Sequence, residues 1–333
     1  MRKSGERIPK KTKCLGSGKK GPRAEEKVTV IDELRQRYSL KILLRVSGLS
    51  KSTYSYYHCE KHLNAVKRRK EEDEHILSLI LPVFEHHKSR YGYRRIILAL
   101  KEELADINHK RIQRIMNENH LFGKQPKNKY HSYKGDNGKK KDNLLLHKEV
   151  DEESHRAKYV RDFDTSKPNE KWTTDVSEFR CAQGKLYLSP VMDMHDGYIV
   201  SYDISISPDF AQTKRMIDEA FDKYPDLKGL IFHSDQGWQY QMKPYQKWLE
   251  DKGILQSFSR KGNCMDNSLM ENFFGIMKNE MYYGYEFKTL EELKKAMEEY
   301  IAYYNTERIN IKRKGLSPLA FRQQSLSQLQ LSY

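Results

Sequence analysis

The chain has 333 residues, enough for two or three domains, because single hydrophobic cores stop growing at roughly 250 residues. Its formal charge of +15 is uneven: residues 1–150 carry +18 and residues 151–333 carry −3, which favours a polyanion partner for the first part over a merely solvated surface. The sequence shows no CxxC pair, no run near the roughly 18 apolar residues of a membrane span and no signal-peptide core, so we expect a soluble, cytoplasmic, nucleoid-associated protein without disulfides, zinc finger or membrane contact.

Residues 1–27 mix Lys, Gly, Ser and Pro without apolar periodicity, which predicts a flexible basic arm. In residues 28–60, apolar positions recur at helical spacing on both sides of a turn at Gly48, and Ser50 can cap a helix that begins near Lys51. This pattern predicts a helix-turn-helix with Lys51 as a DNA contact. An ordinary helical hairpin gives the same pattern.

Residues 70–122 predict a second helical DNA-binding module, with one helix ending near His87 and another capped by Asn108. Its basic side chains are candidate DNA contacts, with a solvated basic face as the alternative: Arg94, Arg95, Lys110, Arg111 and Arg114. Residues 123–165 begin with a stretch rich in Lys, Gly and Asn, which predicts a basic linker.

Residues 166–285 change to short strands, and 286–333 follow as a C-terminal helical segment. Three strands joined by tight turns predict an antiparallel meander: 171–179, 186–193 and 198–206. Helices and strands then alternate: helices 210–224, 245–252, 268–281 and 290–305, and strands 230–233 and 254–258. This order predicts an α/β fold with a mixed five-stranded sheet of the ribonuclease-H-like type, preceded by all-α helix-turn-helix modules.

Three acidic residues are candidates for a catalytic site. Asp175 lies inside a β-branched strand pattern in which aspartate is disfavoured. Asp235 follows an apolar strand, where it could also serve to open a turn, and Glu271 could also complete a capping box with Ser268. Taken singly, only Asp175 lacks a structural explanation.

The spacing strengthens the catalytic interpretation. Thirty-five residues separate Asp235 from Glu271, and a helical register places Asn267, Glu271 and Lys278 on one face. Carboxylates at two strand ends and on a nearby helix suit two Mg²⁺ ions, because hard cations prefer oxygen ligands. We expect Lys278 and Asn267 to contact DNA, and the alternative for Lys278 is a solvated or ion-paired lysine.

The motifs around these acids resemble those of insertion-sequence transposases in the retroviral-integrase superfamily. They are Trp172-Thr173-Thr174-Asp175, His233-Ser234-Asp235-Gln236-Gly237 and Asp266-Asn267-Ser268 through Glu271 to Lys278. The insertion-sequence-three family also has features similar to Tyr91-Gly92-Tyr93-Arg94-Arg95 and to Tyr304-Asn305-Thr306-Glu307-Arg308. The resemblance covers roughly residues 30–325.

This resemblance implies a DDE-type polynucleotidyl transferase with Asp175, Asp235 and Glu271 as catalytic and metal-binding residues. It would use two Mg²⁺ ions, with Mn²⁺ as a substitute, to cleave and join double-stranded DNA at the terminal inverted repeats of a mobile element and at a target. A homo-oligomeric synaptic complex is implied as well. The family's active product joins a first-frame part to this second-frame part, and no sustained heptad precedes residue 30, so the first-frame product is a candidate partner.

Other acids and His233 are not expected in the triad. Asp193 and Asp196 do not fit the motif, and His233 is interpreted as a packed histidine beside a strand end. Two hypotheses of other classes compete: a DNA-binding regulator with an inactive core, and a ribonuclease-H-type nuclease without joining activity. The intact acidic spacing argues against the first, and the basic helical modules argue against the second.

Overall fold

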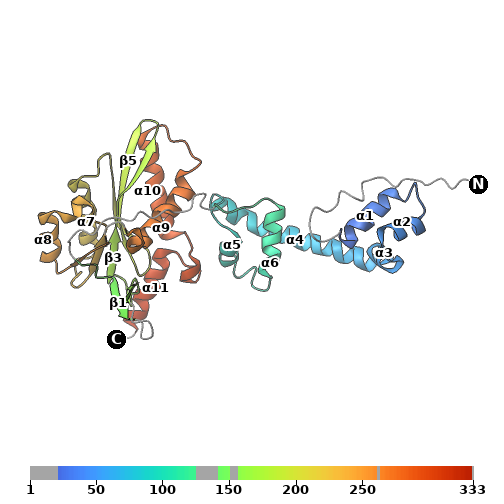
Figure 1. Cartoon of the computed structure of the whole chain (residues 1–333), viewed down its shortest axis with the longest axis horizontal. Coiled ribbons are helices and arrows are strands. Elements are labelled where there is room, and N and C mark those ends of the chain that lie inside the picture. The colour runs from blue at the N-terminus through green and yellow to red at the C-terminus, as the bar shows by residue number, and fades with distance from the viewer. Residues whose placement is uncertain (1–21, 125–141, 151–156, 261–262, 332–333) are drawn as a thin grey trace, which may run out of the picture. The chain divides into compact units, whose positions relative to one another are not determined.

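The computed structural model describes residues 22–124, 142–150, 157–260 and 263–331 (Figure 1). The chain divides into two compact units, Met1–Leu79 and Ile80–Tyr333, and each is described by itself. Among the described residues, no helix is both long and apolar enough to cross a membrane.

The first unit is helical. It holds α1 (Ala24–Leu34), α2 (Leu40–Ser47), α3 (Lys51–His58) and the first part of α4 (Glu60–His86), around a core of Val28, Ile31, Leu43 and Tyr54. Gly48 ends α2 with φ 65°, and the Ser50 hydroxyl accepts the backbone N–H of Thr53 at 3.0 Å. The predicted turn and cap are confirmed. Helix α1 begins within the predicted basic arm, most of which, residues 1–21, lies outside the described residues.

The second unit begins with the end of α4, followed by α5 (Tyr93–Ala99) and α6 (His109–Glu118). The Asn108 side chain accepts the backbone N–H of Lys110 at 2.9 Å, which confirms the predicted cap of α6. The predicted linker needs correction, because two of its segments form an antiparallel pair, β1 (Leu146–Val150) and β2 (Ala157–Arg161). Residues 125–141 of that segment lie outside the described part of the chain.

A mixed sheet forms the centre of this unit. Its strands are β3 (Lys171–Thr174), β4 (Ser177–Cys181), β5 (Gly184–Asp193), β6 (Ile199–Ser205), β7 (Ile231–Ser234) and β8 (Leu255–Phe258). β5 pairs antiparallel with β6 and, in two stretches, with β3 and β4, while β3, β7 and β8 are parallel. Within the described residues, the sheet thus has six strands, because β3 and β4 take the place of the single predicted strand 171–179. The other four strands follow in the predicted order.

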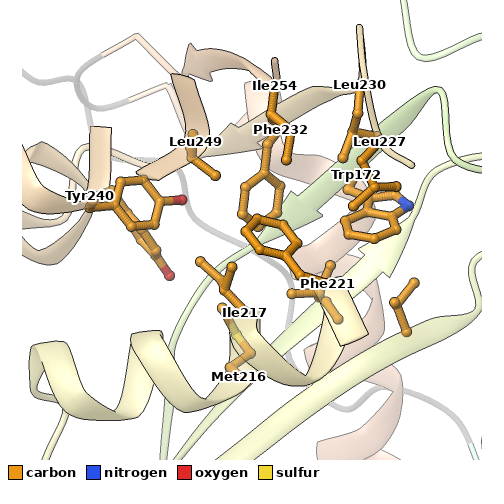
Figure 2. Close-up of a cluster of buried hydrophobic side chains, with 14 of the residues drawn as sticks. Trp172, Met216, Ile217, Phe221, Leu227, Leu230, Phe232, Tyr240, Leu249 and Ile254 are labelled. Atoms are coloured by element: carbon orange, nitrogen blue, oxygen red, sulfur yellow. The ribbon is translucent and has the colours of Figure 1, made fainter. Parts of the chain in front are cut away.

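Helices cover both faces of this sheet (Figure 1). On one face, α7 (Phe210–Lys223) and α8 (Lys243–Asp251) pack through a core that includes Trp172, Phe221 and Phe232 (Figure 2). On the other face, α9 (Ser268–Met277) and α10 (Leu290–Thr306) pack on β4, β5 and β6. The remaining helices are α11 (Pro318–Gln330), the short η2 (Trp238–Gln241), η3 (Cys264–Asn267) and η5 (Ile311–Arg313), and a π-helical turn η4 (Lys278–Tyr282). A mixed sheet between two helical layers is the predicted ribonuclease-H-like class.

Two buried aspartates serve the fold rather than the acidic site. The Arg322 guanidinium on α11 donates to Asp193 and Asp196, both at 2.8 Å, and all three side chains are buried. Burial and the neighbouring Asp193 raise the pKa of Asp196 to about 6, while Arg322 opposes that shift. Their exclusion from the triad agrees with this pairing, which ties the C-terminal helix to the sheet.

A second buried ion pair joins the helical part of this unit to the sheet domain. Glu280, in the π-helical turn, accepts two bonds from Arg308 at 2.9 and 2.7 Å and one from the Tyr300 hydroxyl at 3.0 Å. Arg95 lies 3.5 Å from the same carboxylate and is partly buried. Arg95 thus contacts a carboxylate that Arg308 already pairs, and its predicted DNA contact stays a prediction.

Tyr91, in the same motif as Arg95, also connects α5 to the segment after α10. The Tyr91 hydroxyl donates to the carbonyl of Glu307 at 3.2 Å and accepts the backbone N–H of Ile309 at 3.0 Å. Tyr91 is fully buried. The two outlying motifs, around residues 91–95 and 304–308, therefore contact each other and hold α5 to the end of α10.

We predict that Glu280→Gln destabilises the second unit by about 3–5 kcal/mol, because it leaves the buried Arg308 charge without a counter-charge. Denaturant unfolding of the full chain, with the slope of the transition checked for constancy, measures this loss. Glu298→Gln is the matched control, since it removes a carboxylate paired with Lys294 on the exposed side of α10. A Glu280→Gln loss no larger than that of the control would contradict a stabilising role of the Glu280–Arg308 ion pair.

Candidate active site

Asp175 and Asp235 each follow directly on the end of a central strand. β3 pairs with β7 in parallel, with Thr174 opposite Ser234, so the next residue of each strand leaves the sheet at the same edge. Side chains alternate along a strand, so Asp175 is expected on the same face as Thr173, and Thr173 bonds to the start of α9. The register therefore brings the two carboxylates together beside that helix.

The sheet ladder is interrupted where Asp175 lies. The pairings on either side place Pro190 of β5 opposite Asp175, and proline has no N–H to donate to the ladder. The N–H of Val176 instead donates to Asp175 Oδ1 at 2.7 Å. Asp175 thus lies in a strand break that the sequence interpretation missed, and Pro190 was the available signal.

A tight turn positions Asp235. Its Oδ1 accepts the N–H of Gly237 at 2.9 Å, and a Cβ at Gly237 would lie only 3.0 Å from that oxygen and 2.8 Å from the Gln239 side chain. A side chain at Gly237 would therefore displace the Asp235 or Gln239 side chain. His233, on the preceding strand, is fully buried and its ring nitrogens lie 2.8 and 2.9 Å from the hydroxyls of Ser257 and Ser259. The packed-histidine interpretation is confirmed.

Glu271 lies in the first turn of α9, and that helix is anchored just before it begins. Asn267 accepts a short hydrogen bond from the Thr173 hydroxyl and donates to the Thr174 carbonyl at 3.1 Å. Asn267 is 4% exposed and both ends of its amide bind β3, so in this structure it anchors the helix and does not face solvent. Glu271 follows four residues later, about one turn, and so extends on the same side of the helix.

The residue before this anchor was not singled out from the sequence. Asp266 is buried and binds the side chains of Arg260 and Arg161, with nitrogen–oxygen distances of 2.8 to 2.9 Å. The hydrogen bonds from Arg260 and Arg161 hold its pKa at about 2 although burial opposes them. Asp266 fixes the turn from which α9 starts, and its place at the head of the third motif was the signal.

The three carboxylates repel one another. Burial raises the pKa of Asp175 to about 7, with further increases from the charges of Asp235 and Glu271. Burial also raises the pKa of Asp235, against the hydrogen bond from Gly237. The negative charge of these carboxylates is therefore unfavourable in the chain alone. Divalent cations, which bind carboxylate oxygens, would neutralise that charge.

Lys278 is the cation that the structure places near these acids. It is half-buried, its Nζ lies 5.0 Å from the centre of the Phe179 ring, and its charge lowers the pKa of Asp175. Burial lowers its own pKa. These contacts distinguish it from an ordinary solvated lysine.

The other candidate DNA contacts lie on the helical modules. Lys51, Arg94 and Lys110 are exposed, Arg111 is half-buried, and Arg114 is exposed but bonded to Glu118 at 2.8 Å. Sequence reasoning missed a groove between α2 and α3 in which two further cations, Lys41 and Arg45, line the wall with Lys51. It also missed Trp238, 58% exposed and three residues after Asp235. Exposed aromatic rings near a polynucleotide site can stack on bases.

Comparison with known proteins places this geometry in a family. Residues 165–264 and 271–326 match two models of an integrase core domain, and residues 71–129 match an HTH-like domain. The chain is 42% identical over 296 residues to a putative transposase, InsK, for insertion sequence element IS150 of Escherichia coli, covering 89% of this chain and 98% of that protein.

Two further relatives agree. An uncharacterized transposase-like protein of Haemophilus influenzae is 51% identical over 225 residues, covering 68% of this chain and 97% of its own length. The transposase InsF for IS3A of Escherichia coli is 27% identical over 304 residues, covering 90% of this chain and all of its own length. The catalytic core domain of HTLV-2 integrase, solved with magnesium, is 18% identical with a TM-score of 0.36 over 47% of this chain and 97% of that one, a superposition too loose to support an argument. The chain belongs to the IS3 family of DDE transposases.

Proposed function

We propose that this transposase binds the ends of an insertion sequence and catalyses Mg²⁺-dependent DNA cleavage and strand transfer with Asp175, Asp235 and Glu271. The parallel register of β3 and β7 is the observation that carries the proposal, because it sets the two aspartates at one sheet edge beside α9. The buried Asp266 carboxylate and the buried Asn267 amide fix the start of α9, and Glu271 follows in the first turn of that helix.

The three carboxylates would hold two metal ions, of which Mg²⁺ is the expected pair and Mn²⁺ a substitute. When bound, such a pair activates the attacking oxygen and stabilises the leaving oxygen of a phosphodiester. The chain's own contribution is to orient the three oxygen ligands before DNA arrives. Hydrolysis and attack by a DNA 3′-hydroxyl are then two uses of the same site, distinguished by the nucleophile that is present.

Lys278 would hold a phosphate of the bound strand near the scissile one. Its half-buried ammonium lies close enough to Asp175 to lower that residue's pKa, so it lies at the edge of the acidic site. A cation cannot ligate a metal ion, but it can offset the phosphate charge that the acids repel. It is therefore a DNA-positioning residue in the proposal.

The helical modules would recognise the double-stranded ends. The groove of Lys41, Arg45 and Lys51 and the exposed cations of α5 and α6 supply phosphate contacts. Several copies would assemble on paired ends in a synaptic complex with target DNA, and the first-frame product of the element is a candidate partner. The HTH-like match over residues 71–129 supports DNA binding by this region.

We predict that Asp175→Asn, Asp235→Asn and Glu271→Gln each reduce cleavage and joining by roughly 10⁴-fold or more, as removal of a catalytic residue does in other enzymes. Gel assays on pre-cut and uncut end DNA measure both reactions in Mg²⁺. Asp218→Asn, on the exposed side of α7, is the matched control. Wild-type cleavage by any one of the three variants would remove that residue from the triad.

The same Asp175→Asn variant is expected to be more stable than the wild type at pH 8 without metal. The pKa of Asp175 is raised to about 7 in the folded chain, so its charged form costs stability above that pH and not below the unfolded value. Thermal unfolding with a chelator present measures the difference. A lower melting temperature than the wild type would show that Asp175 serves the fold.

End-DNA affinity of the full chain is expected to fall steeply with salt, with a log-log slope of roughly −0.9 per phosphate contacted. Lys110→Ala should make the slope shallower by about one contact, because Lys110 is exposed in the first turn of α6. Lys295→Ala, an exposed cation on α10 paired with Glu299, is the control. Equal slopes for both variants would place the phosphate contacts elsewhere.

Lys278→Ala should weaken binding to pre-cut end DNA and slow joining, without raising the Mg²⁺ concentration needed for half-maximal rate. Lys278→Arg, which keeps the positive charge, should restore most of the DNA affinity. Fluorescence anisotropy and a Mg²⁺ titration of the joining rate separate the two effects. Unaltered affinity and joining in Lys278→Ala would reduce Lys278 to a packing residue over Phe179.

A further inference from the structure

Three side chains outside the acidic site converge where two helices end. His86 is the last residue of α4, and Glu307 caps the end of α10, more than two hundred residues later. One ligand atom from each of His86, His87 and Glu307 lies within 4.8 Å of the others. His86 Nε2 lies 2.8 Å from Glu307 Oε2.

His87 is held in place by two further contacts. Its ring stacks on Tyr91 with centroids 3.8 Å apart, and its Nδ1 lies 3.1 Å from the Tyr303 hydroxyl. Histidines that bind metals usually hold their second ring nitrogen in such a hydrogen bond, which sets the orientation of the ligating one. With Nδ1 bonded to Tyr303, His87 would bind a ligand through Nε2.

Two helix ends supply partial negative charge at this cluster, and nearby basic side chains oppose it. The last carbonyl groups of a helix carry a partial negative charge, and both α4 and α10 end at this cluster. A cavity of about 340 Å³ adjoins it and is lined by Glu299 as well as Glu307. Lys88 and Arg90 also line the cavity and oppose a cation there. The Arg90 guanidinium is directed to other partners, because it lies 4.4 Å from the Tyr303 ring centre and donates to the carbonyl of Glu280 at 3.3 Å.

We propose that His86, His87 and Glu307 bind a divalent transition-metal ion, with Zn²⁺ as the probe, and that this ion clamps the end of α4 to the end of α10. Two imidazole nitrogens and one carboxylate oxygen suit Zn²⁺, which leaves a fourth position for water from the cavity. Mg²⁺ prefers oxygen ligands alone, so the two metal sites of the protein differ in ligand chemistry.

The clamp would act on the same contact region as Tyr91 and Glu280, since His87 stacks on Tyr91 and Glu307 offers Tyr91 its carbonyl. The simpler alternative is an exposed histidine–glutamate pair, and pairs of that kind add little stability. A metal site requires His86 for tight metal binding, whereas a simple His86–Glu307 pair does not.

The test is calorimetric titration of tag-free full chain with Zn²⁺, carried in an Asp175→Asn, Glu271→Gln background so that the acidic site is disabled. We expect one ion per chain, an affinity loss of at least about 100-fold in His86→Gln and in Glu307→Gln, and a Zn²⁺-dependent rise in melting temperature that both variants lose. Both residues are exposed, so these variants are expected to fold. His75→Gln, an exposed histidine earlier on α4, is the matched control.

Two results would overturn the proposal. One is no Zn²⁺ binding by the background protein at millimolar metal. The other is binding that His86→Gln and Glu307→Gln leave unchanged, because an ion held elsewhere, for example by the free thiols of Cys59 or Cys181, would survive both substitutions. Equal loss in His75→Gln would likewise contradict a site at the helix ends.

Discussion

The parallel pairing of β3 with β7 is the constraint on which the proposed active site depends. It sets Asp175 and Asp235 one residue beyond two adjacent strand ends, where neither takes part in the sheet. A shift of one residue in this register would turn one of the two carboxylates to the opposite face of the sheet. The hydrophobic core beneath the strands opposes such a shift, because Trp172 and Phe232 pack there side by side in the register pair (Figure 2).

Holding three like charges together destabilises the fold unless other contacts offset the repulsion. The charged form of Asp175 is disfavoured by burial and by its neighbours, as its raised pKa shows. The anchors around the site are correspondingly strong: the buried amide of Asn267 on β3 and the carboxylate of Asp266 between two arginines. These groups fix the positions of the acids, and in the proposed mechanism that is the preorganisation that metal-dependent phosphoryl transfer needs.

Much of the fold was predictable from local signals. Ser50 and Asn108 cap the helices expected of them, and the order of strands and helices from residue 171 gave the mixed sheet. The spacing of the three acids could also be predicted, because each lies in a short motif.

Long-range contacts could not be predicted, since no local pattern indicates that Arg95 contacts Glu280 or that Asn267 binds β3. Basic residues in a basic module were assigned to DNA on charge alone, a signal that does not show the contact of Arg95 with Glu280. The strand break at Asp175 depends on Pro190, fifteen residues later in sequence and adjacent only in the sheet.

The most direct test of the account is a crystal structure of the full chain soaked with Mn²⁺, with anomalous scattering used to find the ions. The account predicts two Mn²⁺ peaks whose protein ligands are the carboxylates of Asp175, Asp235 and Glu271. Well-ordered carboxylates without any peak between them, or Mn²⁺ bound at Asp193 and Asp196 instead, would contradict it.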